Sequence, residues 1–492
     1  MTPPDKGRSL LRKSTRRYPT LSRLIDACAR HLPAGLRKPP GADPETGQPT
    51  DERGGEALLS HAQSLAAAAR HDDLRAHAAR MTQRTDDLFL LVRLAIVLRE
   101  AGLFEEADST CRHILQADPG YAFAHYELGV SLAAQRRHAD ALGSFARILT
   151  RLPQDERAHL QVARMQMATG RHAEAEAMLE RLRGFAPAHE DLPWLAEFNR
   201  YLASFPLEAV RAQATAYAES PHYIWEEDIV RRIVQALESR RGFSLVRLGD
   251  GEGAFLRISD EDEARYAHLY RRNRQDRARV WFDGEIDLDA SGFTQTAAGL
   301  ADVIRNADVV GLPPVSWIEH EYRTISPISL SCLVNVVRAM PALDTGQGLC
   351  TQLIHRSLHH NGQLAALLRG RARIGLIACH PDAPALLARG FGIGEVAFHQ
   401  IPGEKLNAAL LGPAAVAGRH FPDRFTALMQ DLSQPLAGEL FLVAGGLLGK
   451  IYCDRIKRSG GVAIDIGSLI DAWLGAPTRP GFFTPRDRLG PA

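Results

Sequence analysis

Two carboxylates lie one residue apart in the segment Gly249-Asp250-Gly251-Glu252, which directly follows the apolar run 243–248. The run is short and strand-prone, so it predicts a buried strand of a parallel sheet. Glycine allows positive φ angles and close backbone approach, so the segment predicts a loop that folds around something small. Carboxylates at the end of such a strand lie where open α/β sheets bind ligands. Two hard oxygen donors suit Mg²⁺ or Mn²⁺ bridging a diphosphate, and the alternative is a solvated acidic turn.

A second glycine-rich turn, 445–450, follows the apolar run 440–444 and begins a helical pattern. Backbone N–H groups at Gly446, the helix dipole and Lys450 would together suit a phosphate group. The spacing is one residue short of a Walker A loop, and Ile451 replaces its Ser or Thr. The alternative is a tight strand-to-helix turn that needs glycine.

Three further groups have chemistry of interest. Asp465 ends the last apolar run, and it either faces the same crevice or caps the helix that follows. His380 follows another apolar run and is a candidate base, although a lone histidine there is more often structural. His355 and His359 form an i, i+4 pair that would suit zinc, but no third ligand type is near them in the sequence.

These groups need a sheet to position them, and the chain after Arg241 has the pattern of one. Apolar runs alternate with helical patterns, which predicts a doubly wound, mostly parallel α/β sheet. The charged segment 260–279 is expected to be a surface insertion or lid rather than part of the core. The helices expected between the strands include 351–368 and 447–458. The expected strands are 243–248, 307–312, 374–379, 396–401, 440–444 and 462–466.

The preceding part of the chain contains an internal repeat with a step of 34 residues, the period of a helix-turn-helix solenoid unit. Alanine lets the second helix of each unit pack close to the first, and proline ends it because proline cannot continue the hydrogen-bond ladder. The step relates two series, Pro119, Pro153 and Pro187, and Ala107, Ala141 and Ala175.

This pattern resembles the tetratricopeptide repeat family over residues 88–190, with 56–87 as a degenerate unit or cap. The family usually holds a peptide or a partner protein in a concave groove. The alternative is a rigid spacer without a ligand.

The segment Leu245–Glu252 is similar to the R-x-G-D-G-E strand and loop of the GT-D-type glycosyltransferases, a bacterial family. The segments 441–450 and 463–467 resemble that family's closing strand, glycine turn and D-I-G ending. The likeness spans about residues 225–475. Leu248 stands where an aromatic residue is common, and Ser468 stands where histidine often follows D-I-G.

The resemblance implies a Rossmann-like domain that transfers a sugar from a nucleotide donor. Asp250 and Glu252 would be the catalytic acidic pair at the metal ion and the diphosphate, and we expect both to bind one ion. We expect the donor to be bound by Arg247, Gly249, Gly251, Gly446, Lys450 and Asp465.

With 492 residues the chain is too long for one ordinary core. We expect a basic, largely disordered arm over 1–55, a helical repeat domain over 56–205, a transferase domain over 206–480 and a tail over 481–492. The arm has ten Lys and Arg up to Pro40 against two acidic residues. Contact of the arm with an anionic membrane surface or with nucleic acid is the alternative to a solvated tail.

The composition narrows the class of protein. A net charge of +1 gives the protein no overall electrostatic attraction to nucleic acid. No run approaches the roughly 18 apolar residues of a membrane helix, and no signal peptide is expected. Six scattered cysteines without a C-x-x-C pair favour reduced thiols in a cytoplasm.

The sequence therefore predicts a cytoplasmic glycosyltransferase that depends on Mn²⁺ or Mg²⁺ and uses a nucleotide sugar, most simply a UDP-sugar. Its repeats would recruit a protein, glycan or lipid-linked acceptor, with no nucleic acid partner and at most peripheral membrane contact. The alternative is a non-catalytic interaction scaffold whose C-terminal domain is a degenerate transferase.

Overall fold

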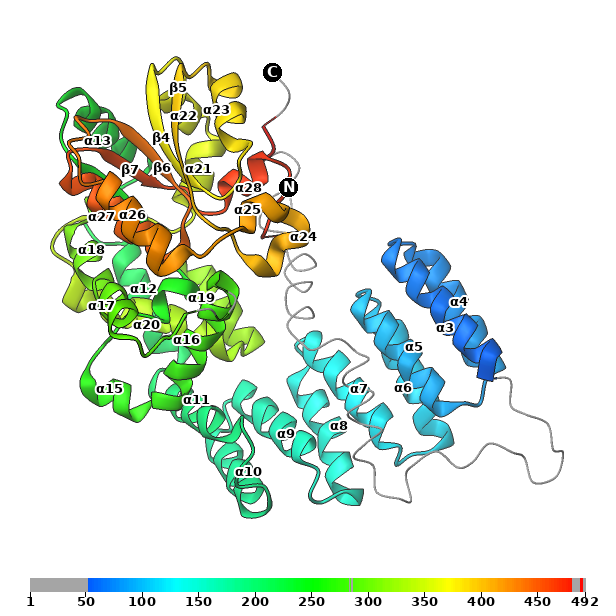
Figure 1. The fold of residues 1–492 in the computed structure, drawn as a ribbon. Coiled ribbons are helices and arrows are strands. Elements are labelled where there is room, and N and C mark those ends of the chain that lie inside the picture. The colour runs from blue at the N-terminus through cyan, green and yellow to red at the C-terminus, as the bar shows by residue number, and fades with distance from the viewer. Residues whose placement is uncertain (1–51, 283, 285, 480–486, 490–492) are drawn as a thin grey trace, which may run out of the picture. The chain divides into compact units, whose positions relative to one another are not determined.

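The computed structural model describes residues 52–282, 284, 286–479 and 487–489 (Figure 1). Residue contacts divide the chain between His189 and Glu190 into two units, which are described separately. The expected disordered arm lies outside the described residues except at its end, where helix α3 begins at Glu52. The expected tail also lies outside them except for 487–489. No helix in the described part of the chain combines the length and the apolarity needed to cross a membrane.

The first unit is a series of helical hairpins, which confirms the predicted helical repeats. From α5 to α10, each helix makes its largest contacts with the helices next to it in the chain. The described helices are α3 (Glu52–Ala67), α4 (His71–Arg84), α5 (Leu88–Glu100), α6 (Phe104–Ala117), α7 (Ala122–Ala134), α8 (His138–Arg151), α9 (Glu156–Ala168) and α10 (His172–Phe185).

The repeat is visible in the backbone as well as in the packing. Gly102, Arg136 and Gly170, each 34 residues apart, all have positive φ angles, of 80°, 65° and 71°. This left-handed residue ends the first helix of each hairpin and suits glycine. Gly129 is needed for a different reason, because a Cβ there would lie 2.7 Å from the ring of Phe145 on the next helix.

The second unit is built on a sheet whose described strands are all parallel, in the order β3-β2-β1-β7-β6-β4-β5. β1 is an interior strand, between β2 and the last strand, β7. The strands are β1 (Phe243–Arg247), β2 (Val309–Leu312), β3 (Gly348–Thr351), β4 (Arg373–Ala378), β5 (Glu395–Gln400), β6 (Leu440–Val443) and β7 (Val462–Asp465).

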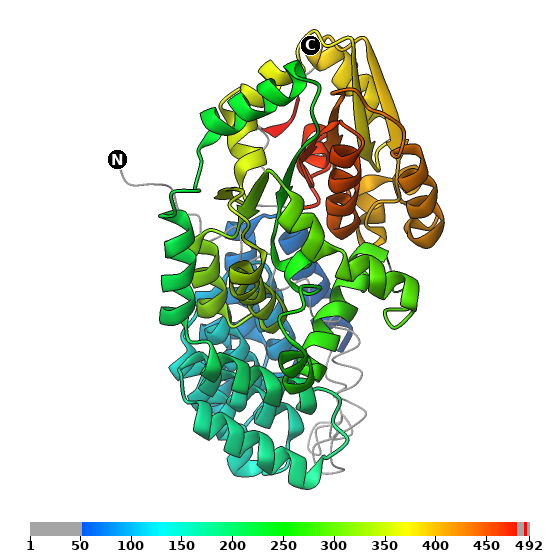
Figure 2. The same cartoon turned by 90° about the vertical axis from the view of Figure 1, so that its left-hand side faces the viewer.

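Helices cover both faces of this sheet, as Figures 1 and 2 show, so the predicted doubly wound fold is confirmed. Successive strand residues enter opposite cores, Leu245 on one face and Val246 on the other. The face of Leu245 packs against α13 (Glu226–Glu238), α21 (Ile354–His360), α22 (Gln363–Leu368), α23 (Ala383–Phe391) and α28 (Leu469–Trp473). The face of Val246 packs against α16 (Ala267–Phe282), α17 (Ser291–Ala298), α18 (Leu300–Asn306), α20 (Pro327–Leu343), α26 (Phe425–Asp431) and α27 (Gly446–Arg458).

The structure departs from the sequence-based expectation in three elements. β3 was not expected, because its four residues begin with glycine and have no apolar alternation. The helix expected over 351–368 is divided at Gly362, whose φ is 72°. The segment 260–279 is not a lid: its helix α16 buries Leu269 and Tyr270, and the Asn273 side chain donates a 2.9 Å hydrogen bond to Ser331 on α20. Of the charges that suggested a lid, Arg271, Arg272 and Arg279 are exposed, whereas Arg277 is buried.

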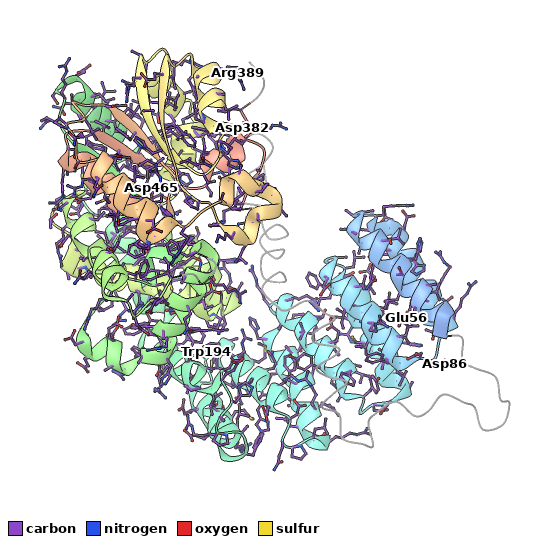
Figure 3. The ribbon with its side chains drawn as sticks, in the orientation of Figure 1. Glu56, Asp86, Trp194, Asp382, Arg389 and Asp465 are labelled. Atoms are coloured by element: carbon purple, nitrogen blue, oxygen red, sulfur yellow. The ribbon has the colours of Figure 1, made fainter. Side chains whose placement is uncertain are left out.

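Helices α11 (Leu192–Ser204) and α12 (Leu207–Ala218) belong to the second unit, whereas the sequence placed the domain boundary near Pro206. The aromatic stripe of α11 is part of the packing there, with Phe198 and Tyr201 fully buried. The Tyr201 hydroxyl donates to the Ser331 carbonyl at 3.2 Å and lies 2.7 Å from Oδ1 of Asn335. Trp194, at the start of α11, lies under the guanidinium of Arg272 on α16 (Figure 3).

These contacts predict where the chain can be divided. A chain that begins at Glu190 should fold with the stability of the intact second unit. A chain that begins at Pro206 should lose about 3–5 kcal/mol or fail to fold, because deleting α11 leaves large buried cavities at Phe198 and Tyr201. Urea unfolding of the two chains, followed by circular dichroism, measures the difference. Equal unfolding midpoints would show that α11 adds nothing to the second unit.

Candidate functional site

The strand β1 ends at Arg247, and the predicted loop after it is a single helical turn, α14 (Asp250–Gly253). Glu252 closes this turn on itself, because its Oε2 accepts a 2.9 Å hydrogen bond from the Gly249 backbone N–H. Glycine is required twice in the turn. A Cβ on Gly251 would lie 2.4 Å from the indole of Trp281, and one on Gly253 would lie 1.9 Å from the carbonyl oxygen of Cys332.

Four charged side chains meet in the interior at the end of β1. Lys450 Nζ lies 2.7 Å from Glu252 Oε1 and 3.1 Å from Asp465 Oδ2, and Arg247 Nη2 lies 3.0 Å from Asp465 Oδ1. All four side chains are at least 92% buried. The two positive and two negative charges compensate one another, and we call this set the β1 charge network.

Each member of the network is placed by the end of a strand. Arg247 is the last residue of β1, Asp465 is the last residue of β7, and Lys450 lies in the first turn of α27 after β6. Figure 3 marks Asp465 in the second unit. Its pairing with Arg247 also involves the backbone, since Arg247 Nε donates to the Asp465 carbonyl at 2.8 Å.

The ionised state of the network follows from its geometry. Burial alone would raise the pKa of Asp465, but Arg247 and Lys450 outweigh it and lower that pKa to about 2. Burial would likewise lower the pKa of Lys450, and Asp465 and Glu252 instead raise it. Asp465 and Lys450 therefore stay charged throughout the physiological range.

His355 joins this network and is not part of a zinc pair with His359. Its Nδ1 lies 2.9 Å from Arg247 Nη1, while His359 Nδ1 accepts a hydrogen bond from Trp473 Nε1 at 3.3 Å. Burial, and then the charge of Arg247, hold the pKa of His355 well below its usual range. A neutral imidazole is what an arginine N–H can use as an acceptor.

Asp250 lies in different surroundings from Glu252. Its Oδ2 accepts a 3.1 Å hydrogen bond from Ser329 Oγ and lies 3.5 Å from Nη1 of the buried Arg277. The side chain of Asp250 is 26% exposed. Burial would lower the pKa of Arg277, but Asp250 and then Asp276 raise it, so the guanidinium is firmly charged.

Further cations and aromatic rings border this region. Arg479 interacts electrostatically with Asp250, and its Nη1 lies 2.8 Å from Glu404 Oε2. The indole of Trp281 lies across both glycine turns, 3.3 Å from the position of a Cβ on Gly446. Beside Trp281 is a small hollow whose lining includes Phe282, Pro402, Gly403, Lys405, His420 and Phe421.

The acidic pair does not fit one divalent ion held by both carboxylates. Glu252 Oε1 is occupied by Lys450 and Oε2 by the Gly249 N–H. Asp250 faces Arg277 instead. The physical reason is that the segment is helical: side chains two residues apart on a helix do not face each other, as they would on an extended loop.

The structure thus brings together four of the residues expected at the site, Arg247, Glu252, Lys450 and Asp465, and places Asp250 on the more open side. Sequence reasoning missed several neighbours of these residues. They come from helices and from the C-terminal segment, and no motif marks them: Arg277, Trp281, Ser329 and Arg479.

The fold and the site define a doubly wound α/β domain with a charged centre at the carboxyl end of its interior strand β1. A family described as a GT-D fold-like domain matches residues 224–398, and two tetratricopeptide repeat families match 92–156 and 132–192. The chain therefore contains a GT-D-like domain preceded by tetratricopeptide repeats. The match ends within β5, so Lys450 and Asp465 lie beyond it.

Among solved structures, a thermophilic tetratricopeptide protein of Thermus thermophilus is 20% identical, covers 34% of this chain and 91% of its own, and has a TM-score of 0.25. A mutant O-GlcNAc transferase of Thermobaculum terrenum is 16% identical, covers 88% of this chain and 91% of its own, and has a TM-score of 0.22. At these TM-scores neither likeness bears on function. No curated protein matches the chain.

Substitutions of Glu252 and Asp250 should lower the stability of the protein by different amounts. Glu252→Gln removes one charge from the β1 charge network and should lower the free energy of unfolding by about 3 kcal/mol. Asp250→Asn keeps a partner for Ser329 at a partly exposed position and should cost less than about 1 kcal/mol. Thermal melts of the two variants beside the unmodified chain test this order. Equal losses for both variants would contradict the separation.

His420, beside the hollow, gives a prediction about pH. It is 92% buried and lies 2.9 Å from the Tyr452 hydroxyl; burial, and then Arg424, lower its pKa to about 3. Between pH 6.5 and 3 the unfolded chain binds a proton here that the folded chain does not. Stability should therefore fall as pH falls, by about 1.4 kcal/mol per pH unit from this residue.

Removing the group should remove this slope. His420→Asn should flatten the pH dependence of the unfolding midpoint between pH 6.5 and 5 relative to the unmodified chain. His399 lies on the edge strand β5 and is less buried than His420, so His399→Asn is the matched control. Parallel pH profiles for the unmodified and the His420→Asn chain would show that His420 does not titrate in this way.

Proposed function

We propose that the second unit is a glycosyltransferase that uses a nucleotide sugar, most simply a UDP-sugar, as its donor. The observation that supports this most is the match to a GT-D-like domain that includes the R-x-G-D-G-E segment at the end of the interior strand β1. Open α/β sheets bind ligands at this edge. The family that the domain resembles consists of glycosyltransferases.

The β1 charge network has a structural part in this proposal. It fixes the ends of β1 and β7 and the start of α27, so the backbone around Gly249 and Gly446 is rigid. Trp281 lies against both glycine turns and offers an aromatic surface for a flat ring such as a nucleobase. The side chains of the network would not contact the donor themselves. They would position the backbone that binds it.

Charged groups on the more open side are the candidates for direct contact with the donor. Arg277 is a buried guanidinium beside Asp250, and Lys405 lines the hollow next to Trp281. Such cations would neutralise the diphosphate of a leaving nucleotide, the kind of fixed charge that speeds group transfer. Asp250 is the candidate catalytic residue, because its carboxylate is the one of the acidic pair that is partly open to solvent.

The expected Mn²⁺ or Mg²⁺ remains a prediction from the sequence resemblance. Only Asp250 of the acidic pair has a carboxylate that is partly open to solvent, so the arrangement gives no shared ion site. A role for the ion is therefore left to experiment.

The acceptor role of the repeats is supported by a hollow of about 370 Å³ whose lining includes Arg112, Arg137 and Arg147 against one carboxylate, Asp140, so that a net positive charge is left for an acidic segment.

The proposal predicts a selective loss of activity. Asp250→Asn should reduce nucleotide release from a panel of nucleotide sugars by about 10²–10³, the usual effect of removing an electrostatic group from a preorganised site. Asp260→Asn, at a side chain that is 92% exposed, should leave the rate unchanged. Release is measured with chelator-treated protein and after adding back Mn²⁺ or Mg²⁺.

The outcomes separate the candidate functions. No release from any nucleotide sugar, with or without added ion, would favour the non-catalytic scaffold. A normal rate for Asp250→Asn would remove that residue from the reaction. If nucleotide release continues in the presence of chelator, no metal ion is needed. The charge of the diphosphate would then be neutralised by Arg277 and its neighbours.

A further inference from the structure

A second group of reactive side chains lies on the same sheet, away from the acidic pair. Cys379 and His380 follow β4, and Asp471 lies on α28. The three residues are each more than nine-tenths buried. Cys379 Sγ lies 4.0 Å from Asp471 Oδ1, and His380 Nε2 lies 3.8 Å from the same oxygen. One ligand atom from each residue lies within 4.8 Å of the others.

The residues around this cluster do not satisfy all of its polar atoms. Asp471 Oδ2 accepts a 2.6 Å hydrogen bond from Thr478 Oγ1, which fixes the carboxylate with Oδ1 toward the other two residues. His380 Nε2 is buried and has no hydrogen-bond partner among the described residues. A buried imidazole nitrogen without a partner is costly in a folded protein and calls for a ligand.

The chemistry of the three ligand atoms selects the type of ligand. A thiolate, an imidazole and a carboxylate together suit zinc or a similar transition metal and do not suit Mg²⁺ or Mn²⁺. Bond lengths of about 2.0–2.3 Å in a tetrahedron place ligand atoms roughly 3.3–3.6 Å apart. The distances of 3.8 and 4.0 Å need a contraction of only a few tenths of an ångström.

We propose that Cys379, His380 and Asp471 bind one zinc-type divalent ion. Thr478 orients the carboxylate from behind, as outer partners of metal ligands commonly do. The ion would join the end of β4 to α28, two elements far apart in the sequence. Figure 3 marks Asp382, two residues after His380, in this part of the second unit. The proposal does not depend on the proposed transferase function, although Arg479 interacts electrostatically with both Asp471 and Asp250.

A second triad, His359, His360 and Asp487, has the same types of nitrogen and oxygen donor but is already satisfied. His360 Nε2 lies 2.5 Å from Asp487 Oδ1, and His359 Nδ1 is bonded to Trp473. The His360 side chain is 42% exposed. This triad also lacks sulfur, so the two sites can be told apart by spectroscopy.

The test uses the full chain, stripped of metal by a chelator and titrated with Co²⁺ under reducing conditions. One equivalent of Co²⁺ should bind with the near-ultraviolet absorption of a cobalt–thiolate bond, and Zn²⁺ should displace it. Cys379→Ser should abolish this band, and His380→Gln and Asp471→Asn should weaken Co²⁺ binding by at least about tenfold. Far-ultraviolet circular dichroism confirms that each variant is folded.

Two control variants locate the ion. Cys453→Ser, at a buried cysteine of α27, and His360→Gln, in the second triad, should keep the cobalt–thiolate band. Absence of the band in the unmodified chain, or its survival in Cys379→Ser, would overturn the proposal. Loss of the band in His360→Gln with retention in His380→Gln would do the same. If Cys379→Ser fails to fold, the affinity of His380→Gln decides the question.

Discussion

Compensation of charge in the interior controls the architecture of this α/β unit. Arg247, Glu252, Lys450 and Asp465 are buried at the end of the interior strand β1, where a single unpaired charge would be very costly. Attraction repays the loss of hydration only when every partner is in place. The end of β1, the turn before α27 and the end of β7 are therefore fixed together or not at all.

That requirement explains why two carboxylates one residue apart have unrelated surroundings. Glu252 is committed to the interior by Lys450 and by the Gly249 N–H. Asp250 projects from another side of the same helical turn, toward Ser329 and Arg277. The short motif thus combines a residue that holds the scaffold with a residue that is open to a ligand.

The sequence was sufficient for features that depend on local periodicity. The 34-residue step, the alternation of strands and helices and the glycine turns before α14 and α27 follow from spacing and residue type alone. It was not sufficient where long-range packing decides. Nothing near Arg277 or Trp281 in the sequence shows that α16 faces Asp250, and the charges around them suggested a solvated segment. The helical form of 250–253 was also hidden, because glycine at 251 and 253 disfavours a helix, while close packing against Trp281 and α20 requires glycine there.

The position of β1 has a consequence for how the chain is made. Its neighbour β7 lies 218 residues further along, as the pairing of Arg247 with Asp465 shows. During synthesis β1 therefore lacks one of its two neighbouring strands until β7 has been made. Contacts of such long range also slow folding once the chain is complete. A nascent chain interrupted before residue 462 therefore lacks the centre of its sheet and leaves an exposed apolar strand, which makes it a natural substrate for chaperones and proteases.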